Sequence, residues 1–144
     1  MKTCSEVMTQ NPVCCLPTNT AANVAQLMKI GDVGSIPVVE DVQTMKLVGI
    51  VTDRDLAMTV VADGRDASTT PVADVMTYDV VTCRTSDDVQ KAVDAMSVHQ
   101  LRRMPVIDGD HRIVGIISQA DVATRVERSE EIAEMVKEIS QPTA

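Results

Sequence analysis

Short runs of branched apolar residues recur along the chain, and the last run in each half ends in the same way. Residues 47–52 are Leu-Val-Gly-Ile-Val-Thr, and residues 113–118 are Ile-Val-Gly-Ile-Ile-Ser. A run of this length and composition is typical of a buried strand. The hydroxyl residue that ends each run is followed three positions later by an aspartate, Asp55 or Asp121. Since both residue types favour helix N-caps, each run predicts a strand that passes directly into a helix.

These two runs belong to an internal repeat. The matched positions are residues 7–9 with 75–77, Met28 with Met96, Pro37 with Pro105, and Gly49 with Gly115. The offset is 68 residues up to the prolines and 66 residues at the glycines. It changes only inside a predicted turn, where chains tolerate insertions, so the pattern indicates duplicated structure.

Each repeat is predicted to follow the order β-α-β-β-α. In the first repeat we expect strands at 12–16, 35–40 and 47–52, a helix from Thr18 or Thr20 to Gly31 with an apolar face of Ala21, Val24, Ala25 and Met28, and a helix at 53–62. In the second we expect strands at 80–83, 103–108 and 112–118, a helix from about Ser86 with an apolar face of Val89, Ala92, Val93 and Met96, and a last helix at 119–139.

A single repeat of about 60 residues buries too little apolar surface to be stable by itself. We therefore predict an α/β (α+β) fold in which the two tandem repeats pack about a pseudo-twofold axis. The predicted boundaries are 5–63 for repeat 1, 64–70 for a linker, 71–126 for repeat 2, and 127–144 for a helix extension and tail.

The composition predicts a core of aliphatic side chains and methionine. The chain has 144 residues, with nine methionines, one tyrosine and no Trp or Phe. Its net charge of −8 argues against a general nucleic-acid binder, which needs a basic face. No apolar run approaches the roughly 18–20 residues of a membrane span. We expect neither a nucleic-acid nor a membrane partner.

The four cysteines, Cys4, Cys14, Cys15 and Cys83, are expected to be reduced thiols. The N-terminus lacks the apolar stretch of a secretion signal, and reduced cysteines are typical of cytoplasmic proteins. A cytoplasmic location is therefore predicted. The two histidines have no cysteine or carboxylate at metal-ligand spacing, so no metal site is expected.

The repeated motifs together resemble the CBS-domain pair, or Bateman module. The resemblance rests on Val-Met-Thr at 7–9 and 75–77, Ile-Pro-Val-Val at 36–39, Met-Pro-Val-Ile at 104–107, Val-Gly-Ile-Val-Thr-x-x-Asp at 48–55, and Val-Gly-Ile-Ile-Ser-x-x-Asp at 114–121. The family implies a regulatory, non-catalytic module that binds an adenosine nucleotide (AMP, ADP or ATP) and requires no cofactor. It also implies a stand-alone bacterial-type protein, a homodimer of pairs, and a separate, unknown protein that is regulated.

The resemblance further implies two ligand clefts, each formed by both repeats. One cleft would take Ser118 and Asp121 from the second repeat, with Thr9, Val13, Cys14, Gly34, Ser35, Ile36 and Pro37 from the first. The other would take Thr52, Arg54 and Asp55 from the first repeat, with Thr77, Val81, Thr82, Arg102, Arg103, Met104 and Pro105 from the second. Aliphatic side chains of these sets would flank the adenine.

The motif residues suit such a ligand. An aspartate can accept hydrogen bonds from both hydroxyls of a ribose. A Ser or Thr hydroxyl beside a helix N-terminus can donate to a phosphate. The same residues would also cap helices with no ligand present, and their spacing alone leaves both interpretations open.

The two clefts differ in charge. Arg54, Arg102 and Arg103 belong to the cleft of Asp55, and arginine can bind phosphate bidentately. The other cleft has glycine and serine where this one has the paired arginines. We therefore predict that the Asp55 cleft binds charged nucleotides more tightly. The simpler interpretation, that these arginines are solvated surface charges, stays open.

Two other functions stay open. The chain could be a structural dimerisation module with degenerate clefts, which would use the apolar face of the last helix. It could also be an enzyme or redox sensor that uses the adjacent Cys14 and Cys15, although buried, unreactive thiols are more common.

Overall fold

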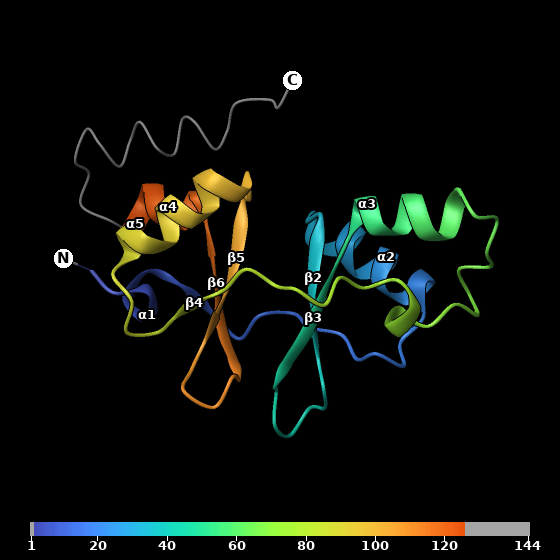
Figure 1. Cartoon of the computed structure of the whole chain (residues 1–144), viewed down its shortest axis with the longest axis horizontal. Helices are drawn as coiled ribbons and strands as arrows, with labels where there is room; N and C mark the ends of the chain where they lie inside the picture. The colour runs from blue at the N-terminus through green and yellow to red at the C-terminus, as the bar shows by residue number, and fades with distance from the viewer. Residues whose placement is uncertain (1, 126–144) are drawn as a thin grey trace. The chain divides into compact units, whose positions relative to one another are not determined.

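The computed structural model describes residues 2–125, which form two compact units (Figure 1). Within these residues, unit 1 contains 2–12 and 81–125, and unit 2 contains 13–80. No described helix is long and apolar enough to cross a membrane. The predicted mixed α+β class and the two repeats are confirmed, whereas the packing of the repeats about a pseudo-twofold axis stays a prediction.

Unit 1 is built on a four-stranded sheet with the order β1-β6-β5-β4. Its elements are α1 (Cys4–Val7), β1 (Thr9–Gln10), β4 (Cys83–Arg84), α4 (Val89–His99), β5 (Arg103–Ile107), β6 (Ile113–Ser118) and α5 (Gln119–Arg125). Strands β5 and β6 form an antiparallel hairpin, β4 joins β5 in parallel, and β1 joins β6 antiparallel. From β4 to α5 the order is the predicted β-α-β-β-α.

Unit 2 repeats this plan around the hairpin of β2 and β3. Its elements are α2 (Ala21–Gly31), β2 (Ser35–Val39), β3 (Leu47–Thr52), α3 (Asp53–Asp55), the π-helix η1 (Leu56–Val61) and the 3-10 helix η2 (Val72–Asp74). Single bridges replace the two outer strands: Cys15 pairs with Val38 in parallel, and Ile50 pairs with Thr77 antiparallel. These bridges correspond, by the repeat offsets, to the β4–β5 and β1–β6 pairings of unit 1.

The segment that opens each repeat in the sequence packs against the hairpin of the other repeat. Residues 2–12, which open the first repeat in sequence, belong to the unit of the second repeat, where β1 pairs with β6. Likewise Thr77 opens the second repeat in sequence but pairs with Ile50 in unit 2. A repeat of the sequence and a unit of the structure therefore do not contain the same residues, because each repeat gives its first segment to the other unit. The predicted boundaries describe the repeats of the sequence and stay a prediction.

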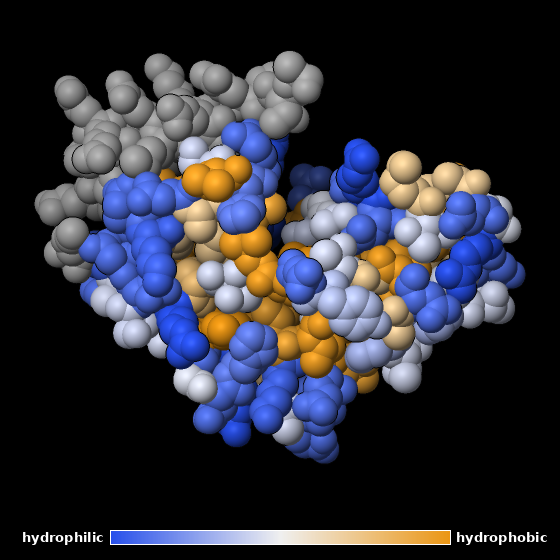
Figure 2. Space-filling view, in the orientation of Figure 1, coloured by the Kyte–Doolittle hydropathy of each residue, from blue (hydrophilic) through white to orange (hydrophobic). Residues whose placement is uncertain are grey.

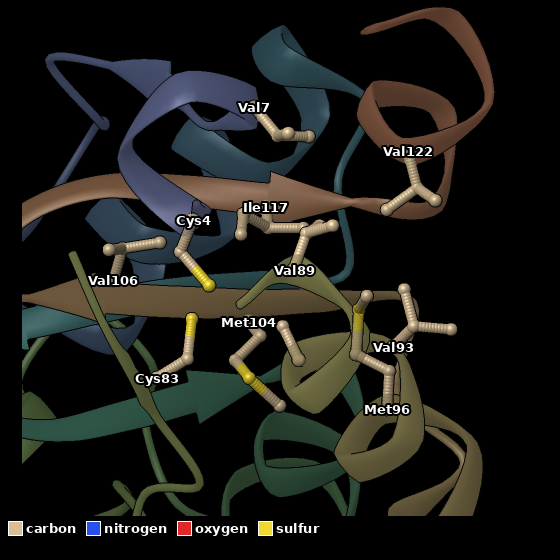
Figure 3. Packing of buried hydrophobic residues seen from close by; sticks show 11 residues of the cluster. Cys4, Val7, Cys83, Val89, Val93, Met96, Met104, Val106, Ile117 and Val122 are labelled. Carbon is tan, nitrogen blue, oxygen red and sulfur yellow. The ribbon is translucent and has the colours of Figure 1, made fainter. Parts of the chain in front are cut away.

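Each unit has its own aliphatic core. Figure 3 shows the core of unit 1, where Met96, Met104 and Ile117 are fully buried beside the thiols of Cys4 and Cys83. The core of unit 2 contains corresponding side chains, among them Cys15, Val24, Met28, Ile36, Val38, Val51 and Val72. The predicted apolar face of α4 is buried completely, but Ala25 on α2 is exposed, contrary to prediction, because α2 turns only Ala21, Val24 and Met28 inward.

Four elements differ clearly in extent from the sequence prediction. The predicted strand at 12–16 is reduced to the single bridge of Cys15 with Val38. The predicted strand at 80–83 is reduced to β4, since only Cys83 and Arg84 find partners on β5. The predicted helix at 53–62 is helical but continues as a π-helix after Asp55, which a hydrophobic period cannot distinguish from an α-helix. Of the predicted last helix, α5 is confirmed to Arg125, and residues 126–139 lie outside the described residues.

Helices α2 and α4 both end at a left-handed residue. Asp32 follows α2 with a φ of 51°, and Gln100 follows α4 with a φ of 55°. Side chains other than glycine are disfavoured in this conformation. We expect Gln100→Gly to raise the melting temperature by roughly 2–4 °C, which thermal denaturation measures. His99→Gly, inside α4, should lower it as the matched control, and a lower melting temperature for Gln100→Gly would contradict the argument.

Candidate ligand-binding sites

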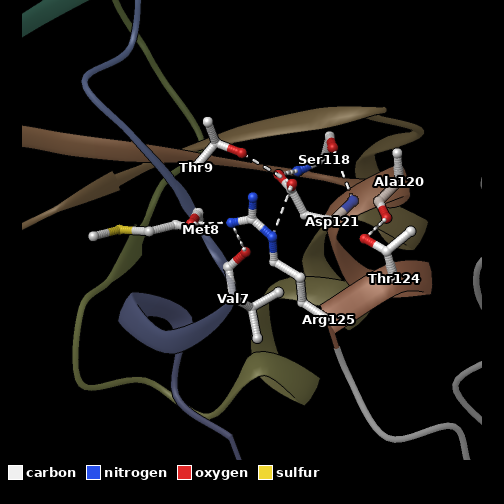
Figure 4. Close-up of polar contacts among 8 residues, drawn as sticks. All are labelled: Val7, Met8, Thr9, Ser118, Ala120, Asp121, Thr124 and Arg125. Carbon is white, nitrogen blue, oxygen red and sulfur yellow. Dashed lines mark hydrogen bonds and ion pairs between the residues drawn. The ribbon is translucent and has the colours of Figure 1, made fainter.

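In unit 1, the hydroxyl and aspartate at the end of β6 form a site around the carboxylate of Asp121 (Figure 4). The Ser118 backbone N–H donates to Asp121 Oδ2 at 3.0 Å, and the Asp121 N–H donates to Ser118 Oγ at 3.1 Å. The Thr9 hydroxyl, from β1, donates to Asp121 Oδ1 at 2.9 Å. Strand β6, helix α5 and the exchanged N-terminal segment therefore all converge on one aspartate.

Unit 2 builds the same arrangement around Asp55. The Thr52 N–H donates to Asp55 Oδ2 and the Asp55 N–H donates to Thr52 Oγ1, both at 3.0 Å. The Thr77 hydroxyl lies 3.3 Å from both Asp55 oxygens. Thr77 corresponds to Thr9 in the repeat, so the exchanged segment again supplies the third residue of the site.

The capping interpretation of these residues is therefore confirmed in both units. Each hydroxyl oxygen accepts the N–H of its aspartate, and each aspartate accepts the N–H of its hydroxyl residue, which is the reciprocal capping box. The caps hold each carboxylate at a fixed place beside the strand end. Capping leaves the hydroxyl proton and the second carboxylate oxygen able to contact a ligand, and the ligand role stays a prediction.

Arg125 distinguishes the site of unit 1 from that of unit 2. Its guanidinium lies 4.0 Å from Asp121 Oδ1 and donates to the carbonyl oxygens of Val7 at 3.3 Å and Met8 at 2.7 Å. By the repeat offset, Thr59 occupies this position in unit 2 and brings no charge. Sequence reasoning missed Arg125, although its spacing of four residues from Asp121 on a predicted helix was the signal for an ion pair.

The two predicted ligand sets are each divided between the units. Of the Asp121 set, Thr9, Ser118 and Asp121 come together in unit 1, whereas Val13, Cys14, Gly34, Ser35, Ile36 and Pro37 belong to unit 2. Of the Asp55 set, Thr52, Arg54, Asp55 and Thr77 belong to unit 2, whereas Val81, Thr82, Arg102, Arg103, Met104 and Pro105 belong to unit 1. The membership of residues from the opposite unit stays a prediction.

The structure places Arg102 and Arg103 in unit 1, the unit of Asp121, so their predicted place in the Asp55 cleft stays a prediction. Arg103 on β5 lies opposite Ser118 in the hairpin, and Ser35 on β2 occupies the corresponding place opposite Thr52. Arg102 accepts a backbone hydrogen bond from Gln119 at its carbonyl oxygen. Both arginines are exposed, and so is Arg54. Each of the three can therefore direct its charge to solvent or to an anion.

Cys14 and Cys15 have the properties of unreactive thiols. Burial raises the pKa of Cys14 to about 11, and burial together with the neighbouring Cys14 raises that of Cys15 to about 12. Almost no thiolate is present on either residue at neutral pH, so neither is a good nucleophile. Among residues 2–125 no group of three or more His, Cys, Asp or Glu side chains is placed to hold a metal ion.

Comparison with known proteins identifies the repeats. The family model described as CBS domain matches residues 4–62 and 72–128. The CBS domain-containing protein YhcV of Bacillus subtilis is 35% identical over 140 residues, which cover 97% of this chain and 96% of YhcV. Hypoxic response protein 1 of Mycobacterium tuberculosis is 31% identical over 144 residues, which cover 100% of this chain and 98% of that protein.

Solved structures agree with this fold. A crystal structure of Hypoxic Response Protein I with two coordinated zinc ions has a TM-score of 0.76 at 31% identity and covers 88% of this chain and 100% of its own. The structure of CBSX2 in complex with AMP has a TM-score of 0.73 at 24% identity, with coverage of 95% and 99%. At that identity CBSX2 supports the shared fold alone.

Proposed function

Since the chain belongs to the CBS-domain family, we propose that it is a non-catalytic regulatory module that binds an adenosine nucleotide of the AMP, ADP or ATP type. One observation carries the proposal: each unit holds an aspartate and a hydroxyl residue together at the end of its hairpin, with a threonine from the exchanged segment. The arrangement occurs twice in one chain, so two half-sites of the same chemistry are available.

The half-sites suit a ribose 5′-phosphate. A ribose diol presents two hydroxyl donors, and a carboxylate can accept both with charge assistance. The oxygens of Asp55 that contact Thr77 would instead accept from the diol. The Thr52 hydroxyl already accepts the N–H of Asp55, so its own proton is directed to another acceptor, such as a phosphate oxygen.

We propose that the Asp55 half-site is the stronger of the two for charged nucleotides. The Thr77 contacts of Asp55 are 3.3 Å long, whereas Thr9 contacts Asp121 at 2.9 Å and Arg125 also lies beside that carboxylate. A ligand therefore displaces weaker contacts at Asp55. Arg54, next to Asp55 in the chain, supplies a positive charge for phosphate, and the contribution of Arg102 and Arg103 stays as predicted from the sequence.

A thermal-shift panel of adenine and guanine nucleotides tests the proposal. A ligand that binds only the folded chain at a hundredfold excess over its dissociation constant adds about 2.7 kcal/mol to the free energy of unfolding. We expect at least one adenine nucleotide to raise the melting temperature by roughly 5–10 °C. CBSX2, which has the same fold, is described in complex with AMP, so AMP is the first ligand to test. If no adenine nucleotide changes the melting temperature at millimolar concentration, the proposal fails.

A second candidate function is a structural dimerisation module with degenerate clefts. Large apolar side chains are exposed at Ile30, Met58, Val61 and Val98, and Figure 2 shows apolar residues at the surface of the η1 helix among hydrophilic neighbours. Ile30 and Val98 occupy equivalent places in the repeat. We propose that such surfaces take part in a homodimer of CBS pairs. An Asp55→Ala, Asp121→Ala double variant with unchanged ligand response and an intact dimer would favour the structural function over the nucleotide-binding one.

The location and the regulated protein also belong to this proposal. We propose a cytoplasmic protein, because none of the four cysteines, all within residues 2–125, forms a disulfide, and a separate protein as the target of regulation. No cofactor is proposed beyond the regulatory nucleotide.

A further inference from the structure

Two thiols from distant parts of the sequence meet in the core of unit 1. Cys4 lies in α1 and Cys83 in β4, and their side chains are 0% and 4% exposed. Figure 3 shows the two sulfur atoms pointing toward one another between α1 and the sheet. The Cys83 thiol also lies 3.8 Å from the Pro105 carbonyl oxygen, and the Cys4 thiol lies 4.0 Å from the Asp88 carbonyl oxygen. The interaction between the two thiols lowers the pKa of Cys4 and raises the pKa of Cys83.

The backbone holds this pair in register. The Cys4 N–H donates to the Asp87 carbonyl oxygen at 2.8 Å, and the Ser5 N–H donates to the Thr85 carbonyl oxygen at 3.1 Å. Thr3 and Asp88 form a further antiparallel bridge. Helix α1 is therefore held by backbone hydrogen bonds beside the segment that follows Cys83, which keeps the two cysteines in the same part of the core.

The equivalent place in unit 2 carries only one thiol. By the repeat offset, Cys15 corresponds to Cys83 and Val72 corresponds to Cys4, and both residues are buried in the core of unit 2. Val72 is fully buried in unit 2, as Cys4 is in unit 1, so a valine can occupy this core position. Cys15 provides an internal control, because it takes the place of Cys83 in unit 2, where the position equivalent to Cys4 is the buried Val72.

We propose that Cys4 and Cys83 form a reversible intramolecular disulfide on oxidation, which ties the N-terminal segment to the rest of unit 1. With hydrogen peroxide as oxidant, the Cys4 thiolate attacks one peroxide oxygen, which gives a sulfenic acid and hydroxide. The Cys83 sulfur then attacks the Cys4 sulfur and expels a second hydroxide. The two thiol protons neutralise both hydroxides, so two thiols and one peroxide give one disulfide and two waters.

The environment assigns the two roles. The interaction with the Cys83 side chain lowers the pKa of Cys4, so Cys4 is the first thiolate to form. The interaction with Cys4 and burial raise the pKa of Cys83, so Cys83 keeps its proton during the first step and reacts second. Because both sulfurs are buried, the oxidant reaches them when the short N-terminal helix opens locally, and oxidation should be slower than that of an exposed thiol.

The disulfide would close a ring that contains all of unit 2. Residues 13–80 lie between the two cysteines, so the bond links segments far apart in the chain and removes much freedom from the unfolded state. It would also anchor β1, which follows α1 and carries Thr9 to Asp121. We expect the oxidised chain to melt roughly 5–10 °C above the reduced chain.

Peptide mapping after peroxide treatment tests the proposal on the full chain. Free thiols are blocked, and cleavage after Lys and Arg is followed by mass spectrometry without reductant. The expected product is peptide 3–29 joined to peptide 66–84, with two hydrogen atoms lost and dithiothreitol reversing the change. Since peptide 3–29 also contains Cys14 and Cys15, the link must disappear in Cys4→Ala and persist in a Cys14→Ala, Cys15→Ala double variant.

Three results would overturn the proposal. The first is that all four thiols stay blockable in the folded oxidised sample, which would make Cys4 and Cys83 inert core residues. The second is a link that persists in Cys4→Ala, or one that joins two chains. The third is a Cys4–Cys83 link that leaves the melting temperature unchanged, which would remove its role as a tie. Mapping of the unsubstituted chain decides the first point even if a variant fails to fold.

Discussion

Replacing Gly115 by alanine is expected to lower the free energy of unfolding by about 2–3 kcal/mol. A Cβ atom at Gly115 would clash with the sulfur of Met8 and would lie 2.9 Å from the Thr9 carbonyl oxygen. The methionine side chain can move, but the backbone of Thr9 is held by the β1–β6 pairing. The methyl group therefore pushes the exchanged N-terminal segment away from the sheet, and urea unfolding followed by circular dichroism measures the loss.

Two other glycines serve as comparisons for this result. At Gly49, the corresponding position of unit 2, the added Cβ would lie 3.0 Å from the Thr77 carbonyl oxygen and 2.9 Å from the Met76 sulfur, so Gly49→Ala should cost less than Gly115→Ala. At Gly109 nothing lies within 4 Å, so Gly109→Ala should change the free energy by less than about 0.5 kcal/mol. Equal effects at Gly115 and Gly109 would contradict the close approach of β1.

Asp55→Ala is expected to weaken the binding of the adenine nucleotide identified in the thermal-shift panel by roughly 10- to 100-fold. The carboxylate would supply charge-assisted hydrogen bonds to the ribose, which are worth about 1.5–3 kcal/mol. The variant also loses the cap on Thr52, at about 1 kcal/mol, so calorimetric titration is done well below its melting temperature. Asp63→Ala, which removes an exposed aspartate of the same unit, is the charge-matched control.

The same substitution at Asp121 separates stability from binding. Asp121 contacts Thr9, the Ser118 N–H and Arg125, so Asp121→Ala should destabilise the chain more than Asp55→Ala does. Its effect on affinity for charged nucleotides should be smaller, because the Asp55 half-site is proposed to be the stronger. If Asp121→Ala abolishes binding and Asp55→Ala leaves it unchanged, the proposed order of the two half-sites is wrong.

The repeat made much of the fold predictable. Strand β3 has the predicted bounds of Leu47–Thr52, and the hydroxyl–aspartate spacing correctly predicted a cap at the end of both hairpins. Hydrophobic period and capping chemistry are local properties, and they can be recognised in a single sequence. The pairing of residues 2–12 with the second repeat is not local, since it joins Thr9 to Ile116. Hydrophobic period and spacing did not indicate it, and only the family resemblance grouped Thr9 with Ser118 and Asp121.

Arg125 and Cys4 show why parts of the site could not be predicted. The i,i+4 spacing of Asp121 and Arg125 could have indicated their contact, but the hydrogen bonds from Arg125 to the Val7 and Met8 carbonyl oxygens depend on the exchanged segment. The sequence suggested the adjacent Cys14 and Cys15 as candidate reactive thiols. The paired thiols are Cys4 and Cys83, which only the fold of unit 1 brings together.

A nuclear magnetic resonance titration with AMP tests the central claim most directly, because it locates the ligand as well as detecting it. The reporters are the backbone amides of Thr52, Asp55, Ser118 and Asp121, which take part in the two capping boxes. We predict saturable chemical-shift changes of these amides, and those of Thr52 and Asp55 should saturate at the lowest AMP concentration. In the Asp55→Ala, Asp121→Ala double variant, AMP should cause no shift at these four positions. Unshifted amides at millimolar AMP, ADP and ATP, or shifts confined to other parts of the chain, would contradict the account.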